Sequence, residues 1–314
     1  MEQHTDNMLM KIRSGGACVT TGLRLYMSNF RRIFRHTWPA ALFYGIVASF
    51  IGTLTVTTYP KLMAALLTNP ASDVVSHFMS LVIAYGVASL LGFFAVVLLV
   101  GSGMSVLWQH QQTGVIGRPA RWFSIDRRTL VRTLVAFIFI VVLLAVVYLL
   151  SAVLTSLVVR ELGMITGIAL MTVVFIVFLV LTLPFDYVTT KYVLFHRYSL
   201  FKHIAVGYTT GMRHAGLIFV VAFIMALIVM VCTLFTAMPA FILSSASLRA
   251  YSGTIGGDPL GMPSYIGVLT AVTLLLSGFI QAYIILLHLF PSYYVYGSIE
   301  TQEDERAEAM KKIK

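Results

Sequence analysis

Residues 162–181 read LGMITGIALMTVVFIVFLVL, a run in which no side chain carries a charge. About 20 apolar residues in a helix extend roughly 30 Å, the thickness of the hydrocarbon core of a bilayer. The run therefore predicts a membrane-spanning helix. Residues 182–197, TLPFDYVTTKYVLFHR, follow it and bring a proline, an aspartate, two tyrosines and a lysine together where the run ends.

Runs of this kind recur along the whole chain. Its 314 residues are 59% hydrophobic and 11% charged, whereas a soluble domain has roughly 25% charged residues. Backbone groups inside a bilayer must be hydrogen-bonded within their own segment, and helices achieve this. The expected fold class is all-α, a polytopic membrane protein with six transmembrane helices. The expected spans cover approximately 38–58, 79–107, 133–158, 162–184, 215–245 and 265–290.

The basic residues predict the orientation of these spans. Of the 22 Lys and Arg, only Lys61, Arg160 and Arg249 lie outside four segments. Basic residues concentrate in cytoplasmic loops, so both termini are expected in the cytoplasm of a bacterial inner membrane. The net charge of +10 then favours anionic lipids of the inner leaflet as partners rather than nucleic acid. The four segments are 1–37, 109–132, 191–213 and 299–314.

The chain divides into three parts. Residues 1–37 are expected to be a cytoplasmic segment with an interfacial helix, 38–298 a six-helix membrane domain, and 299–314 a charged cytoplasmic tail. The N-terminus is polar and lacks the pattern of a cleavable signal. Cys18 precedes the first span and Cys232 lies inside the fifth, so no disulfide is expected.

Residues 23–34, LRLYMSNFRRIF, have apolar side chains at roughly helical spacing and arginines largely elsewhere around the turn. This pattern is typical of an amphipathic helix in the plane of the interface, with Arg24, Arg31 and Arg32 at the lipid head groups. A soluble lead-in to the first span is the alternative. Arg35, Arg132 and Arg213 are the other basic residues expected at the head groups.

Arg35, Arg132 and Arg213 also suggest an internal repeat. Each follows a mixed basic and aromatic stretch and precedes an odd-numbered span. We expect a three-fold repeat in which an interfacial helix precedes a membrane hairpin, since weak internal symmetry is common in membrane proteins. The positive-inside rule alone would also place an arginine at the end of each inner loop, so both interpretations stay open.

The stretch LPFDYVTTKYVLFHR followed by SLFKHIAVGYTTGMRHAG carries a resemblance to a known group. It resembles the cytoplasmic loop of bacterial six-helix membrane proteins that include the membrane domain of glycerophosphodiester phosphodiesterases. The resemblance covers residues 182–220 by pattern and most of the chain by topology. It implies a six-helix membrane fold. No catalytic domain is attached, so it implies no phosphodiesterase activity.

Asp186 is the one carboxylate expected near a membrane segment. Charge in a bilayer is costly and is usually kept for function, so Asp186 is a candidate site residue. The alternative is a membrane exit, in which Asp186 is hydrated or bonded to a nearby threonine or to a basic group of the next loop. Tyr187 would then lie at head-group depth, and Lys191 would snorkel to the inner surface.

Gln281 and His288 are the other candidate polar residues, seven apart and so on one face of the sixth span. A lone intramembrane histidine most simply bonds a neighbouring helix, because metal ligation needs several donors. No nucleophile motif or phosphate-binding glycine loop is present, so no catalytic residue, metal or cofactor is assigned.

The sequence thus favours a non-enzymatic membrane protein that interacts with lipids or organises membrane partners, including a second copy of itself. A transporter or permease for a small solute or a lipid is the alternative.

Overall fold

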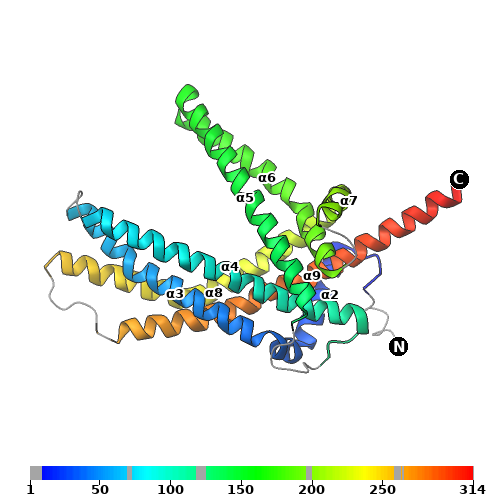
Figure 1. Cartoon of the computed structure of the whole chain (residues 1–314), viewed down its shortest axis with the longest axis horizontal. Coiled ribbons are helices and arrows are strands. Elements are labelled where there is room, and N and C mark those ends of the chain that lie inside the picture. The colour runs from blue at the N-terminus through cyan, green and yellow to red at the C-terminus, as the bar shows by residue number, and fades with distance from the viewer. Residues whose placement is uncertain are drawn as a thin grey trace.

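The computed structural model describes residues 9–68, 73–117, 125–195, 200–257, 263 and 265–313. Within these residues every regular element is an α-helix (Figure 1). Six helices are long and apolar enough to cross a membrane, which confirms the predicted fold class. The helices are α2 (Gly15–Ser28), α3 (Phe30–Thr68), α4 (Asp73–Thr113), α5 (Arg127–Leu162), α6 (Met164–Leu194), α7 (Leu200–Arg213), α8 (Ala215–Ile255) and α9 (Ile266–Ile313).

The six long helices form three hairpins, α3–α4, α5–α6 and α8–α9, and the two helices of each hairpin pack against each other. α5 and α6 are joined at Gly163, whose φ of 86° is a conformation that glycine adopts readily and other residues rarely do. We call the end of the molecule that carries α2, α7 and the C-terminal part of α9 the basal end. The opposite end, where Gly163 lies, is the distal end.

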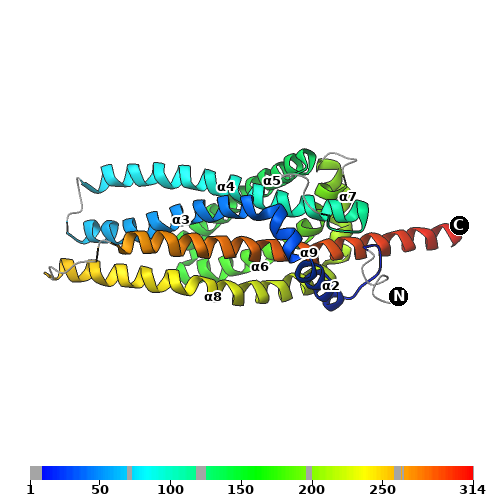
Figure 2. The same cartoon turned by 90° about the horizontal axis from the view of Figure 1, so that it is seen from below.

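α9 is the central helix of the molecule. It packs against α2, α3, α4, α6 and α8, and Figure 2 shows it running along the middle of the bundle and past its basal end. The α5–α6 hairpin is placed differently. It joins the bundle near the basal end and diverges from it toward the distal end (Figure 1). The molecule therefore has two arms of unequal size that meet at the basal end.

α2 and α7 lie across the basal end in related ways. α2 packs on α9, where a Cβ at Gly22 would lie 2.6 Å from the backbone nitrogen of Pro291. α7 packs on α6, where a Cβ at Gly211 would lie 2.9 Å from the Cβ of Pro184. Each glycine belongs to a similar stretch, TTGLR at 20–24 and TTGMR at 209–213. Two of the three expected interfacial helices are thus present, and residues 118–124, before α5, lie outside the described part.

Two details of the predicted repeat are wrong. Residues 23–34 do not form one helix, because the chain breaks at Asn29 between α2 and α3, and Arg31 and Arg32 belong to α3. Arg213 is not equivalent to Arg35 and Arg132. The latter two lie near the starts of spanning helices, whereas Arg213 ends α7, two residues after its glycine, as Arg24 follows Gly22 in α2.

The spanning helices extend beyond the predicted spans. Pro184, Pro239 and Pro291 lie inside α6, α8 and α9, so no helix ends at its proline. α6 continues for ten residues beyond Pro184 to Leu194, and α9 continues through the charged segment to Ile313. The basal end is consequently built from helices that pack on one another past the apolar runs.

Candidate functional site

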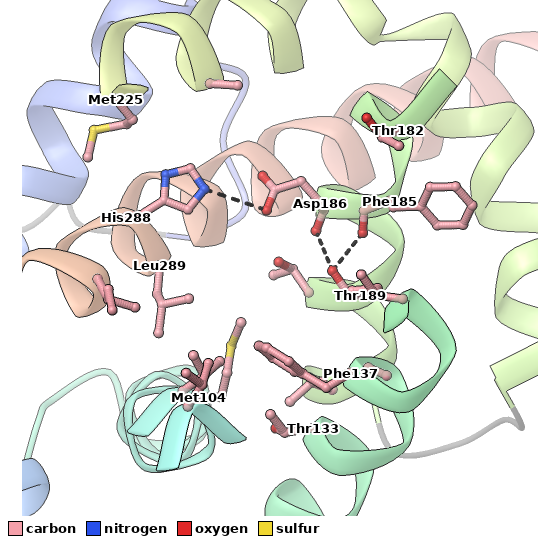
Figure 3. A pocket seen from close by; sticks show the side chains of 18 of the residues that line it. Met104, Thr133, Phe137, Thr182, Phe185, Asp186, Thr189, Met225, His288 and Leu289 are labelled. Carbon is pink, nitrogen blue, oxygen red and sulfur yellow. Dashed lines mark hydrogen bonds and ion pairs between the residues drawn. The ribbon is translucent and has the colours of Figure 1, made fainter. Parts of the chain in front are cut away.

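A cavity of about 640 Å³ lies where the α5–α6 hairpin meets the rest of the bundle (Figure 3). This volume is within the range of small-molecule sites. Five helices line the cavity. The lining residues include Met104 of α4, Thr133 and Phe137 of α5, Thr182, Phe185, Asp186 and Thr189 of α6, Met225 of α8, and His288 and Leu289 of α9.

The cavity wall is mostly apolar. Three of its threonines donate their hydroxyls to carbonyl oxygens of their own helices, Thr133 to Thr129, Thr182 to Leu179, and Thr189 to Phe185. These hydroxyls are therefore satisfied locally. Among the described lining residues, Asp186 and His288 are the two with ionisable side chains.

Asp186 and His288 face each other across the cavity wall, from α6 and α9 (Figure 3). His288 Nε2 lies 3.9 Å from Asp186 Oδ1, and Ser292 Oγ donates a hydrogen bond of 2.8 Å to Asp186 Oδ2. Both ionisable side chains are about one-third exposed, at 35% and 38%. The protein partners of the Asp186 side chain thus come from α9 and not from a threonine or a basic group of the next loop, while Thr189 Oγ1 donates to the Asp186 backbone carbonyl at 3.2 Å.

Tyr187 and Lys191 contact a different carboxylate. Lys191 Nζ lies 2.6 Å from Glu300 Oε1 and 3.1 Å from the Tyr187 hydroxyl, and that hydroxyl donates to Glu300. Tyr187 is buried in the protein, beside Lys191 and Glu300. Lys191 is held in an ion pair rather than extended to the surface. The expected snorkelling of Lys191 is therefore wrong, since α9 continues alongside α6 and supplies Glu300.

A second carboxylate of α9 completes this arrangement. Glu303 accepts from His214 Nε2 at 3.0 Å and from Arg213 Nη1 at 3.3 Å, at the break between α7 and α8. We call Tyr187, Lys191, Arg213, His214, Glu300 and Glu303 the basal cluster. It fastens the C-terminal part of α9 to α6 and α7.

Gln281 lies outside the cavity lining. Its Nε2 donates to Thr233 Oγ1 at 3.0 Å, and its Oε1 accepts from Thr236 Oγ1 at 3.3 Å. Both threonines belong to α8. Gln281 thus joins two neighbouring helices, which is the use of polar side chains expected inside membranes.

The arginines predicted to meet lipid head groups fall into two groups. Arg132 Nη1 donates to the carbonyl oxygens of Tyr192 and Phe195, and its guanidinium lies 4.8 Å above the Tyr192 ring. Arg213 belongs to the basal cluster. Arg24, Arg31, Arg32 and Arg35 have exposed side chains at the basal end. The last three line a concavity of about 390 Å³ with Ser28 and Asn29, which we call the arginine concavity.

Sequence reasoning missed Ser292 and Glu300 as site residues. It expected the sixth span to end near residue 290 and assigned residues 299–314 to a charged tail. One signal was present: Tyr293, Tyr294, Val295, Tyr296 and Ile299 continue the apolar character beyond Pro291, and all five are buried. An apolar stretch of this kind indicates that the helix continues against a core.

The comparisons with known proteins gave no match: no family model, curated protein or solved structure is similar to this chain. The cavity and its neighbours are therefore interpreted from geometry alone. Among the described residues no group of three or more His, Cys, Asp or Glu side chains is arranged to hold a metal ion.

Proposed function

We propose that this integral membrane protein is non-enzymatic and binds an amphiphilic molecule from the surrounding bilayer in the cavity at the junction of its two arms. One observation carries the proposal. The cavity has a mostly apolar wall formed by five helices, with one polar patch where Asp186 and His288 lie side by side. A molecule with a hydrocarbon tail and a polar head matches this division, since apolar groups gain free energy on burial and polar groups require partners.

The path to the cavity supports a ligand that arrives from the bilayer. Lining residues Leu144 of α5 and Ala226 of α8 are exposed, and they belong to different arms. The faces next to this opening are apolar too, with Val141 and Phe223 about half exposed. A molecule dissolved in the hydrocarbon reaches the cavity without crossing water.

The basal end supports a second lipid contact. The arginine concavity gathers three guanidinium groups, which bind phosphate oxygens with charge-assisted hydrogen bonds. We propose anionic lipids of the inner leaflet as partners there, in a bacterial inner membrane with both termini in the cytoplasm. Another membrane protein or a second copy of this chain is the other proposed partner, since the exposed apolar faces of α5 and α6 offer surface for helix packing.

A transporter for a small solute or a lipid is the second candidate function. It is favoured by the Asp186–His288 pair, because ionisable residues on a cavity wall inside a membrane are typical of transport pathways. Movement of the ligand between leaflets, measured in vesicles, distinguishes a transporter from a protein that only binds.

The experiment that tests binding removes space from the cavity. The full-length protein is purified in native membrane discs, and its lipids are identified by mass spectrometry. Ala226→Trp, which fills the cavity, should lower the amount of retained amphiphile several-fold. Ala145→Trp is the matched control, because Ala145 is exposed on α5 and does not line the cavity. Equal lipid content in the two variants would contradict the proposal.

A further inference from the structure

The Asp186 carboxylate on the cavity wall can accept more hydrogen bonds than it receives from the described residues. A carboxylate accepts about four hydrogen bonds, and within the described residues the Asp186 side chain accepts one, from Ser292 to Oδ2. His288 Nε2, at 3.9 Å from Oδ1, is beyond hydrogen-bond distance. Oδ1 therefore keeps the capacity to accept from a donor on the ligand.

The described lining residues also include no lysine or arginine that would match an anionic ligand. The two cations closest in sequence to lining residues are held elsewhere. Arg132 contacts Tyr192 and Phe195, and Lys191 is paired with Glu300 in the basal cluster. An anionic head group would meet Asp186 without a compensating charge, which is costly at low dielectric.

From these contacts we infer that the ligand is an amphiphile whose head group is a cation with N–H donors, of the primary ammonium class. The Asp186 carboxylate binds this head group, and the apolar wall formed by residues such as Phe137, Met225 and Leu289 holds the tail. This inference rests on the proposed function and adds the chemistry of the head group to it. It assigns the cavity a cationic head group, whereas the positive charge of the arginine concavity favours an anionic one.

The test compares three single-chain amphiphiles that share one tail length. Hexadecylamine, hexadecan-1-ol and hexadecanoate are added separately, at equal mole fraction in micelles of a non-ionic detergent, to the purified full-length protein. Bound adducts are counted by native mass spectrometry. The amine should bind at least about tenfold more tightly than the carboxylate, the factor expected of one charge-assisted hydrogen bond, with the alcohol between them.

Three variants locate the effect. Asp186→Asn should abolish the preference for the amine, whereas Glu303→Gln, which neutralises a carboxylate of the basal cluster, should keep it. Ala226→Trp should reduce the binding of all three amphiphiles. The ranking in the unmodified protein needs no variant to fold, so the inference stays testable if Asp186→Asn is unstable.

The outcomes distinguish failure of the head-group inference from failure of the proposed function. Tight binding of hexadecanoate, or an amine preference that persists in Asp186→Asn, would overturn the head-group inference. If Ala226→Trp still reduces all binding in that case, the proposed function stands. If Ala226→Trp leaves the binding of every amphiphile unchanged, the ligands bind outside the cavity and the proposed function itself fails.

Discussion

Asp186 and Tyr187 are neighbours in the sequence, yet their side chains project from different sides of α6. Successive side chains of an α-helix point about 100° apart, so one can line a cavity while the next is buried. Asp186 faces the cavity and bonds Ser292, and Tyr187 turns to Glu300 in the basal cluster. A single turn of α6 therefore holds both the carboxylate that we propose binds the ligand and part of the structural link to α9.

The ion pair between Lys191 and Glu300 gives the first prediction. Both side chains are only 23% exposed. Glu300→Gln should lower the free energy of unfolding by about 1–3 kcal/mol, because it leaves the Lys191 ammonium without its counter-charge in a partly buried place. The loss is measured by thermal or denaturant unfolding in detergent, and a double-mutant cycle with Lys191→Met isolates the coupling between the two residues.

A matched pair nearby provides the control for this cycle. Arg213 also contacts a carboxylate of α9, Glu303, but its side chain is 55% exposed. Exposed pairs contribute about 0–1 kcal/mol, so the coupling between Arg213 and Glu303 should be the smaller of the two. Equal coupling in both pairs would contradict the structural role given to Lys191.

The thiol of Cys18 gives a prediction about pH. Cys18 in α2 is buried, and burial raises the pKa of this thiol from 9.0 to about 11, although nearby Arg13 opposes the shift. Alkylation by N-ethylmaleimide should be slow from pH 7 to 9 and accelerate only as the pH approaches 11. Because the folded state keeps the thiol proton longer, its contribution to stability is present below pH 9 and is lost as the pH rises toward 11.

Denatured protein is the control for Cys18. In detergent that unfolds the chain, the same thiol should react quickly already at pH 8, close to its ordinary range. Comparable rates at pH 8 in folded and unfolded protein would show that the thiol is not protected.

At the scale of single residues, sequence reasoning could identify candidates but not their partners. Asp186 and His288 were predictable because a charged or polar side chain is rare in an apolar run. Their proximity was not, since it joins residues of α6 and α9 that no local pattern relates. Glu300 was misplaced for the same reason: its partner, Lys191, is supplied by a helix far away in the sequence.

At the scale of elements, two crossings between a glycine and a proline hold the basal helices in place. Gly22 lets α2 approach the backbone of α9 at Pro291, and Gly211 lets α7 approach α6 at Pro184. Small residues at helix crossings allow backbones to come close, which favours association inside membranes. These crossings position α2 and α7 across the ends of the spanning helices.

The crossing at Gly22 predicts a clear effect of adding one methyl group. Gly22→Ala should destabilise the protein by about 1–3 kcal/mol, because the new Cβ would lie 2.6 Å from backbone atoms of Pro291, which cannot move aside easily. Unfolding in detergent measures the change.

Gly16→Ala is the matched control on the same helix. A Cβ at Gly16 has no heavy atom within 4 Å, so alanine should leave stability unchanged or raise it by about 0.5–1 kcal/mol through its helix propensity. If Gly22→Ala were as stable as Gly16→Ala, α2 would not pack on α9 as described.

The existence of the spanning helices was predictable because the apolar signal of each lies within its own segment. Their ends were not, because basal packing rather than bilayer thickness sets them. α6 passes Pro184 to reach Leu194, where it packs with α7 and α9. The break between α2 and α3 at Asn29 could not be predicted from the sequence either, since the apolar spacing of 23–34 continues across it.

At the scale of the whole molecule, the divergence of the α5–α6 hairpin defines where the cavity lies. Toward the distal end α5 and α6 expose large apolar side chains, with Tyr148 at 71% and Ile165 at 86%. In a bilayer these faces meet lipid, which costs nothing for apolar groups. The divergence of the two arms is therefore compatible with a bilayer, and on the proposed function the cavity at their junction opens toward the hydrocarbon.

The orientation of the molecule is open to a direct test by cysteine labelling. On a Cys18→Ser, Cys232→Ser background, Ala205→Cys in α7 should react with an impermeant maleimide only after the cells are permeabilised. Ser252→Cys, near the distal end of α8, should react in intact cells. Both positions are exposed, so accessibility depends on the side of the membrane. Labelling of Ala205→Cys in intact cells would reverse the proposed topology, in which the basal end faces the cytoplasm.

The central position of α9 has a consequence for how the protein is made. A ribosome synthesises α9 last, yet α9 packs against α2, α3, α4, α6 and α8. Until it is inserted, Asp186 lacks Ser292 and Lys191 lacks Glu300. Translation proceeds at about 5–20 residues per second, so the earlier helices wait for seconds with their inner faces uncovered. Assembly of the bundle is therefore completed only after α9 has been inserted.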